Sequence, residues 1–237
     1  MTSNNLSENI EEYLEVLYRE GSNKEQVSTT TLSNELKIAP ASVTQMLKKL
    51  ESLGYINYVP YKGAILTDKG MSIAQKITRK HRIIEKFLTD ILNIKPENVH
   101  SQACEMEHSL SDEAERALCF LLEYPALCPD NNNIPACDFD FNCCRDCQNE
   151  EDFDNVVSRK NNLLSLSELK TNLTGKISFI RGNDKILKDA NELGMNIGCV
   201  ITFNVNNQDE GTVSILIDNK DIKIPLEIAN NIFIEIE

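Results

Sequence analysis

The stretch from residue 40 to 66 constrains the fold most, because it encodes a helix followed at once by a short hairpin. Pro40 suits the first turn of a helix, and Gly54 suits its end. Residues 55–59 and 64–66 then predict two strands around a turn with a basic tip, Pro60-Tyr61-Lys62-Gly63. An amphipathic helix over 10–17 and a capped short helix over 28–36 precede this stretch. This order of elements predicts a winged helix-turn-helix.

The charge distribution agrees with a DNA-binding role for this part of the chain. The whole chain carries a net charge of −13, which by itself argues against nucleic acid. Between Lys37 and Arg82, however, nine basic residues stand against two acidic ones, so this stretch carries nine minus two, or +7. A local basic face is typical of phosphate binding. Winged helices also serve as protein-interaction modules, and the charge favours DNA over that alternative.

In a winged helix, the second helix of the motif enters the major groove and the wing contacts phosphate. The positions predicted to face DNA lie at the start of the second helix and at the tip of the hairpin. They are Ala39, Ala41, Ser42, Thr44, Gln45, Lys48 and Lys62.

The run from residue 100 to 108 carries side chains that bind metals. At 100° per residue, four of them fall within an arc of about 100° beside an apolar stripe. These four are His100, Cys104, Glu107 and His108. Imidazole, thiolate and carboxylate are the preferred ligands of divalent transition metals. A helix with an ordinary polar edge is the alternative.

His81 and Glu85 form a second group of metal-binding side chains, one helical turn apart. His81 interrupts an apolar stripe, so its imidazole is expected to be at least half buried and to need a partner. A core hydrogen bond would satisfy it, and so would a metal. The helix that carries this pair is predicted over 68–92, and the next helix continues to about residue 124. Two long, partly apolar helices suit dimerisation, and a dimer matches a palindromic DNA site.

Eight cysteines and the absence of a membrane segment bound the remaining possibilities. No apolar run approaches the roughly 18 residues of a membrane helix, and the first residues lack a signal sequence, so we expect a cytoplasmic protein without membrane contact. Cysteines in that compartment indicate metal or redox chemistry rather than disulfides. Five lie close together in an acidic segment, namely Cys128, Cys137, Cys143, Cys144 and Cys147. They predict a zinc site or an iron–sulfur cluster; the alternative is an acidic linker with free thiols.

The last third of the chain predicts strands. Apolar and polar residues alternate over five short runs: 176–181, 200–205, 212–217, 222–224 and 232–236. Between the first two runs, residues 183–193 predict a short helix that Gly194 ends.

Taken together, these motifs resemble the iron- and manganese-dependent transcriptional regulators of the DtxR/MntR type. The resemblance covers about residues 6–127. It rests on Ile-Glu-Glu-Tyr-Leu-Glu-Val-Leu-Tyr at 10–18, Ala-Ser-Val-Thr-Gln-Met-Leu-Lys-Lys-Leu at 41–50, Leu-Thr-Asp-Lys-Gly at 66–70, Arg-Lys-His-Arg at 79–82 and the run at 100–113. The C-terminal strands resemble the FeoA-type, SH3-like domain that many of these regulators carry.

The resemblance implies a ligand set for two metal sites between the DNA-binding and dimerisation domains. The primary site would take Glu12 together with Cys104, Glu107 and His108. The ancillary site would take His81, Glu85 and His100, and His81 with Glu15 also matches ligand positions of the manganese-sensing branch. In the C-terminal domain, the positions that can lend ligands fall near Asn183 and Ile186, and isoleucine cannot ligate.

The chain mixes features of the two branches. Iron sensors usually have methionine where Glu12 stands, and manganese sensors usually have a carboxylate where Cys104 stands. A thiolate suits iron(II) better than manganese(II), so iron(II) is the expected metal and manganese(II) the alternative. The family often has a polar residue or proline where Ala39 and Ala41 stand, so the operator sequence cannot be transferred.

The expected fold is mainly α with β, in four parts. We predict a winged helix-turn-helix over 1–70, a helical metal-binding and dimerisation domain over 71–127, a Cys-rich acidic linker over 128–160 and an SH3-like β-barrel over 161–237. The expected function is that of a homodimeric, metal-activated repressor that binds double-stranded DNA at a palindromic operator. A redox or iron–sulfur sensor acting through the cysteine segment is a further alternative. A metal-dependent hydrolase with Glu107 as base is disfavoured, because no nucleophile is signalled, and we expect no enzymatic activity.

Overall fold

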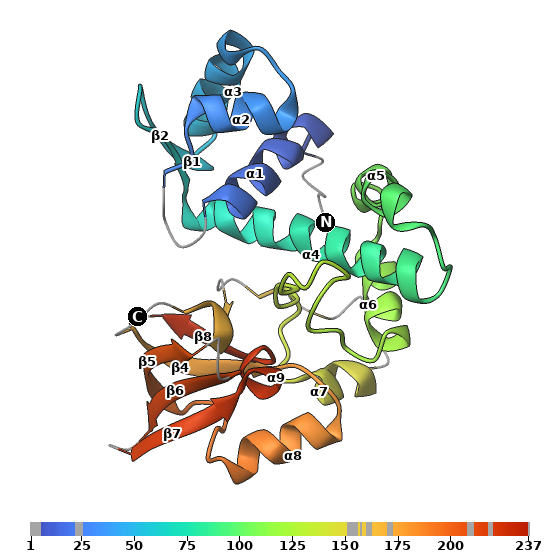
Figure 1. Cartoon of the computed structure of the whole chain (residues 1–237), viewed down its shortest axis with the longest axis vertical. Coiled ribbons are helices and arrows are strands. Elements are labelled where there is room, and N and C mark those ends of the chain that lie inside the picture. The colour runs from blue at the N-terminus through green and yellow to red at the C-terminus, as the bar shows by residue number, and fades with distance from the viewer. Residues whose placement is uncertain are drawn as a thin grey trace. The chain divides into compact units, whose positions relative to one another are not determined.

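The computed structural model describes residues 6–21, 26–150, 156, 158–159, 163–169, 173–207, 211–217 and 220–236, apart from the side chains of 204–207. Contacts within the chain divide it into an N-terminal unit, Met1–Thr78, and a C-terminal unit, Arg79–Glu237. Each unit has its own buried apolar core. The division falls within helix α4 (Asp68–Asp90), whose first half belongs to the N-terminal unit (Figure 1).

The N-terminal unit contains the predicted winged helix-turn-helix. Its elements are α1 (Glu8–Glu20), α2 (Thr29–Leu36), α3 (Pro40–Ser52), β1 (Ile56–Val59), β2 (Gly63–Leu66) and the start of α4. The Ser28 hydroxyl caps α2 by accepting a hydrogen bond from the Thr31 N–H at 3.0 Å, and Pro40 opens α3. β1 and β2 pair antiparallel, with Val59 opposite Gly63.

Two glycines in this unit let backbone segments approach closely. Gly63 has φ of +122°, and a Cβ there would lie 2.3 Å from the Val27 carbonyl oxygen. At Gly70, in the first turn of α4, a Cβ would lie 2.0 Å from the Tyr55 carbonyl oxygen. No larger residue fits either place without moving the backbone.

The helices of the C-terminal unit depart from the sequence prediction at one point. The single helix expected up to about residue 124 is wrong, because it is divided into α5 (Pro96–Glu107) and α6 (Asp112–Leu121). Ser111 starts the second helix by accepting a hydrogen bond from the Ala114 N–H at 3.1 Å. Acidic residues in the first turn of α6 stabilise the helix, because their negative charge lies near the positive end of the helix dipole. A further short helix, α7 (Cys144–Asn149), begins at the Cys144–Cys147 pair.

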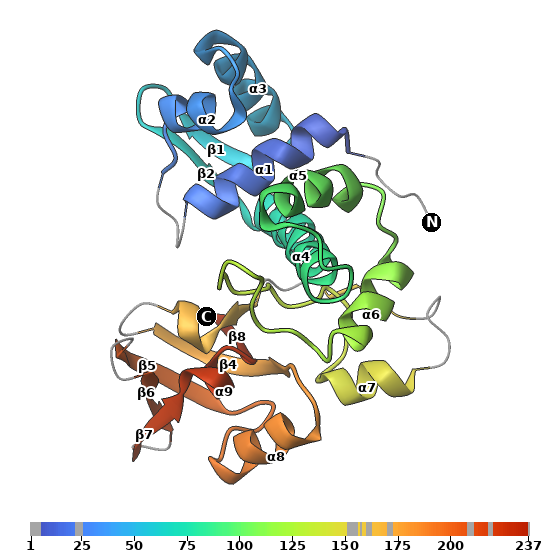
Figure 2. The same cartoon turned by 45° about the vertical axis from the view of Figure 1, so that its right-hand side comes forward.

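The rest of the C-terminal unit is an antiparallel sheet with two helices. Its elements are β3 (Leu164–Ser165), η2 (Leu166–Glu168), β4 (Leu173–Ile180), α8 (Asp184–Glu192), β5 (Val200–Asn207), β6 (Thr212–Ile217), β7 (Lys220–Pro225), α9 (Leu226–Ala229) and β8 (Ile232–Ile236). The strand order is β3-β8-β4-β5-β6-β7. α8 packs on the sheet through Ala190 and Ile186, and Figure 2 shows it beside the strands.

The predicted strands are present, and the predicted alternation is confirmed in β6, where Val213, Ile215 and Ile217 are buried and their neighbours are partly exposed. In β8 it is wrong, because Ile232, Phe233 and Ile234 are buried in succession. The mainly α with β fold class is confirmed as well. Among the described pairings, none joins β3 to β7, so the described strands do not close the predicted SH3-like domain into a barrel. Within the described residues, no helix is long and apolar enough to cross a membrane.

Candidate metal centre

Packing of the second half of α4 on α5 assembles the candidate metal centre. Ile84 and Leu88 of α4 form a buried cluster with Val99 and Ala103 of α5. This contact turns the polar edge of each helix toward the other. The centre that results, which we call the α4–α5 centre, consists of His81, Glu85, His100, Cys104, Glu107 and His108.

His81 lies in the middle of the centre and is only 4% exposed. Its Nδ1 lies 2.5 Å from Oε2 of Glu107, and its Nε2 lies 3.0 Å from Oε1 of Glu85. The same Nε2 is 3.1 Å from Nδ1 of His100. Both nitrogens of this buried ring therefore face other metal-binding groups, as the burial argument from the sequence anticipated.

Cys104 and His108 complete the set. The Cys104 sulfur lies 3.9 Å from His81 Nδ1 and 3.8 Å from His100 Nε2. Consequently His81, His100 and Cys104 each offer one donor atom within 4.8 Å of the others. His108 Nε2 lies 3.4 Å from Oε1 of Glu107. Of the residues assigned to two sites by resemblance, the six on α4 and α5 or at the end of α5 thus form one continuous network in the C-terminal unit.

The contacts within the centre favour the deprotonated forms of Glu85 and Cys104, which bind metals, and they hold a proton on His100 that a metal would displace. Burial would raise the pKa of Glu85, but hydrogen bonds from His100 and His81 prevail and lower it to about 2. The hydrogen bond with Cys104, followed by the one with Glu85, raises the pKa of His100 to about 10. Hydrogen bonds from His100 and His81 in turn lower the pKa of the Cys104 thiol. A metal ion would take the place of the protons that hold this network together.

The donor set fits a divalent transition metal. Imidazole nitrogens, a thiolate and carboxylates bind such ions at about 2.0–2.3 Å, so donor atoms within 4.8 Å of one another can share one ion. Glu107 is 3% exposed, which would shield a bound ion from solvent. The pKa shifts of Cys104 and Glu85 point the same way, because metal ligands bind in the deprotonated form.

The predicted DNA-facing residues lie on the N-terminal unit. Ala39 is the N-cap of α3, and the side chains of the predicted set on this helix are exposed except for Thr44, which is partly buried. The Thr44 hydroxyl donates a hydrogen bond to the Pro40 carbonyl oxygen at 2.9 Å. Lys62 is exposed at the tip between β1 and β2, next to the fully exposed Tyr61. These side chains are accessible to a partner, and their contact with DNA stays a prediction.

Comparison with known proteins agrees with this division of roles. Three family models match in succession: the iron-dependent repressor N-terminal DNA-binding domain over residues 5–64, the iron-dependent repressor metal-binding and dimerisation domain over 67–136, and the FeoA domain over 164–236. A transcriptional regulator of the helix-turn-helix type from Methanocaldococcus jannaschii is 43% identical over 121 residues, which cover 50% of this chain and 95% of that protein. The regulator MntR of Oceanobacillus iheyensis is 32% identical over 43% of this chain and 69% of its own length.

The chain belongs to the DtxR/MntR family of metal-dependent DNA-binding repressors. Another relative, the iron-dependent repressor IdeR of Mycobacterium tuberculosis, is 32% identical over 56% of this chain and 57% of its own length. Among solved structures, the metal-dependent transcriptional regulator MtsR has a TM-score of 0.51 at 24% identity, covering 98% of this chain and 100% of that one. The manganese regulator SloR has a TM-score of 0.50, also at 24% identity and the same coverage. These two likenesses show the shared fold of the DtxR/MntR family.

Two ligands that the family resemblance implies lie in the other unit. Glu12 and Glu15 are both on α1, where Glu12 is exposed and Glu15 is 9% exposed. They belong to the N-terminal unit, whereas the α4–α5 centre belongs to the C-terminal unit. Their participation in metal binding therefore stays a prediction for this DtxR/MntR-type repressor.

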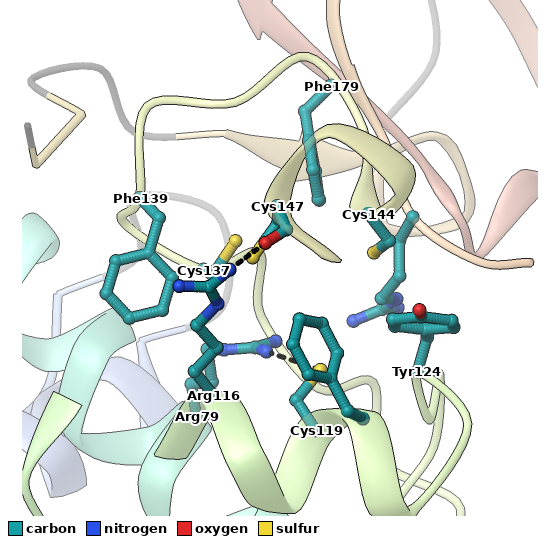
Figure 3. A pocket seen from close by; sticks show the side chains of 11 residues that line it. Arg79, Arg116, Cys119, Tyr124, Cys137, Phe139, Cys144, Cys147 and Phe179 are labelled. Atoms are coloured by element: carbon teal, nitrogen blue, oxygen red, sulfur yellow. Dashed lines mark hydrogen bonds between the residues drawn. The ribbon is translucent and has the colours of Figure 1, made fainter. Parts of the chain in front are cut away.

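The cysteine segment differs in detail from the expectation. Cys137, Cys144 and Cys147 line one cavity, together with Cys119 of α6 (Figure 3). Cys128 packs instead against Ile83 and Ile134. Cys143 is partly exposed and precedes α7. Sequence reasoning missed Cys119, because it lies outside the cysteine-rich segment; its place on the buried face of a helix was the signal that could have found it.

Proposed function

We propose that this repressor binds a palindromic operator as a homodimer when a divalent metal, preferably iron(II), occupies the α4–α5 centre. The observation that carries the proposal is the compact trio of His81, His100 and Cys104, two imidazoles and a thiol within 4.8 Å. A thiolate ligand favours iron(II) over manganese(II), because manganese prefers harder oxygen ligands.

His81, Glu85, His100, Cys104, Glu107 and His108 would supply the ligands of one or two ions, with Glu12 or Glu15 of α1 adding a carboxylate. When bound, the ion supplies a cross-link between side chains of different helices. α1 belongs to the same unit as α3, so an added carboxylate would couple the centre to the recognition helix. Metal would then shift the population toward one orientation of the two α3 helices of a dimer, which fixes their spacing on the operator.

Exposed apolar side chains support dimerisation through the second part of the chain. Two of them follow α4, one lies on α5 and one on α6: Ile91, Leu92, Met106 and Leu121, which are between 39% and 56% exposed. Large exposed apolar side chains on neighbouring elements are typical of protein interfaces. We therefore assign dimerisation to residues 71–127, and retain 1–70, 128–160 and 161–237 as the DNA-binding, linking and FeoA-type parts. Residues 151–155, 157 and 160 of the proposed linker lie outside the described residues.

A manganese-responsive repressor is the second candidate. The carboxylates of Glu12 and Glu15 on α1 favour it, since hard oxygen ligands suit manganese(II). The two candidates differ only in the ion that activates DNA binding.

An anaerobic DNA-binding titration separates the candidates. An operator is first selected from random-sequence DNA with the metal-loaded protein, and its binding is then measured with iron(II), manganese(II) and zinc(II) in parallel. Iron(II) should activate DNA binding at a lower free concentration than manganese(II) does. Activation by manganese(II) at a lower concentration than iron(II) would support the second candidate. A DNA affinity that none of the three metals changes would refute both candidates.

A further inference from the structure

Four buried cysteines from separate segments surround one cavity in the C-terminal unit. Cys119 comes from α6, Cys137 from the loop after it, and Cys144 and Cys147 from α7 (Figure 3). Each side chain is only 6–7% exposed, and each is a free thiol. The cavity encloses about 20 Å³, so side chains do not fill the space between the four cysteines.

Two buried arginines, Arg79 and Arg181, lie in the walls of this cavity. Arg79 donates a hydrogen bond to the Cys119 sulfur at 3.2 Å and pairs with Glu115 at 2.7 Å. Arg181 is 1% exposed, and its guanidinium donates to three neutral oxygens. These are Oδ1 of Asn231 at 3.0 Å and the carbonyl oxygens of Ile134 at 2.6 Å and Asn230 at 2.8 Å. A buried cation that donates to neutral oxygens favours a negatively charged occupant nearby.

Both ends of the Cys144–Cys147 pair are fixed by hydrogen bonds to other elements. The Gly182 N–H donates to the Cys144 sulfur at 3.4 Å. Gly182 has φ of +120°, and a Cβ there would lie 2.9 Å from Ile186 Cβ, so the close approach of this N–H requires glycine. At the other end, Arg116 of α6 donates to the carbonyl oxygens of Cys147 and Glu150. Hydrogen bonds from backbone N–H groups to sulfur are a common way in which proteins tune metal-bound thiolates.

We propose that Cys119, Cys137, Cys144 and Cys147 form a four-thiolate site for a thiophilic metal, held as a zinc ion or as an iron–sulfur cluster. Cys-X-X-Cys at a helix start is a frequent chelating pair for both. Four thiolates around Zn²⁺, or around an iron–sulfur cluster, carry a net negative charge that would offset Arg79 and Arg181. Each thiol would release its proton to solvent as it binds, and a cluster would require iron and sulfide from solution.

The spacing of the sulfurs bears on the two forms of the site. Around one zinc ion, with Zn–S of about 2.3 Å, tetrahedral sulfurs lie about 3.8 Å apart. The four thiol groups are not gathered as tightly as the donors of His81, His100 and Cys104. Zinc would therefore draw α7 and Cys119 together, whereas a cluster binds each thiolate to a different iron and accepts a wider spacing.

Metal analysis of cysteine variants tests the proposal. Full-length protein is purified anaerobically without chelator as wild type, Cys119→Ser, Cys144→Ser/Cys147→Ser and the control Cys128→Ser, which alters a buried cysteine outside the cavity. Bound zinc, iron and acid-labile sulfide are measured, and absorption spectra are recorded. The wild type and the control should carry the same amount of metal. The other two variants should lack the metal that the cavity cysteines hold. Zinc without sulfide indicates the ion, and iron with sulfide and visible absorption indicates the cluster.

A second measurement uses only the wild type, so it does not depend on the folding of variants. Alkylation of the native protein, read residue by residue by mass spectrometry, should spare the four cavity cysteines until a chelator removes the metal. Equal metal in the wild type and in the cavity variants would overturn the proposal. A loss in Cys128→Ser as large as in Cys119→Ser, or alkylation that a chelator does not change, would do the same. The α4–α5 centre is intact in every variant, so the proposed function does not depend on this outcome.

Discussion

At the scale of single residues, the proposed metal centre depends most on His81. This buried imidazole lies between the carboxylates of Glu85 and Glu107. His81→Ala would leave both carboxylates in a buried place without their shared partner, which costs about 1–3 kcal/mol of unfolding free energy. Denaturant unfolding in the presence of a chelator measures this cost. Glu105→Ala is the control, because Glu105 is exposed on α5 and lies outside the centre, and its cost should stay below about 0.5 kcal/mol. Equal costs for the two variants would contradict the central role of His81.

Cys104 is the residue that we expect to set the metal preference. Cys104→Asp replaces a soft thiolate by a hard carboxylate, while His81 and His100 stay in place. The ratio of iron(II) to manganese(II) affinity should fall by about tenfold or more in this variant. Competition titrations under anaerobic conditions measure the ratio directly. An unchanged ratio would mean that the thiolate does not bind the ion.

At the scale of helices and strands, local sequence signals predicted the winged helix but not the arrangement of the cysteines. Ser28, Pro40 and Gly54 act within a few residues of the helix ends that they define, so the sequence reveals them. The cap at Ser111 is just as local, yet the continuing apolar pattern hid it. The meeting of Cys119 with the α7 cysteines is different in kind, because packing of α6 and α7 in three dimensions creates it. The pairing of the last strands, likewise, depends on long-range contacts.

The wing between β1 and β2 should bind the DNA backbone. Lys62 is exposed at its tip, so Lys62→Ala should weaken binding to all sequences alike and reduce the slope of log Kd against log salt by about one. Lys188→Ala removes an exposed lysine from α8, in the other unit, and should leave the slope unchanged. Fluorescence anisotropy at several salt concentrations provides both values. A loss confined to one sequence would instead assign the wing to base recognition.

The start of α4 should tolerate no side chain at Gly70. Glycine to alanine within a helix usually stabilises a protein by about 0.5–1 kcal/mol. At Gly70, however, the new Cβ would lie 2.0 Å from the Tyr55 carbonyl oxygen, so Gly70→Ala should lower the unfolding free energy by about 1–3 kcal/mol. Ser72→Ala, two residues along the same helix, should change it by less than about 0.5 kcal/mol. Stabilisation by Gly70→Ala would show that α4 does not approach Tyr55 this closely.

At the scale of the whole molecule, the proposed function requires that metal binding in one unit of the chain alters DNA binding by the other. The N-terminal unit carries the recognition helix, and the C-terminal unit carries the α4–α5 centre and the exposed apolar side chains assigned to the dimer. Metal-dependent DNA binding requires that a metal in the centre changes the orientation or spacing of the two recognition helices of the dimer. The coupling free energy follows from the factor by which metal changes the affinity for DNA. Measuring DNA binding with and without metal therefore gives this free energy directly.

The central claim is tested most directly by the affinity for the selected operator, measured with saturating iron(II) and with chelator, for the wild type and for His108→Ala. His108 is a nearly buried donor beside Glu107, with 10% of its side chain exposed. In the wild type, metal should tighten binding by about tenfold or more, which corresponds to about 1.4 kcal/mol. Circular dichroism and sedimentation should show that His108→Ala is a folded dimer. Its affinities for the operator with iron(II) and with chelator should be equal. A variant that keeps the full metal response would contradict the account.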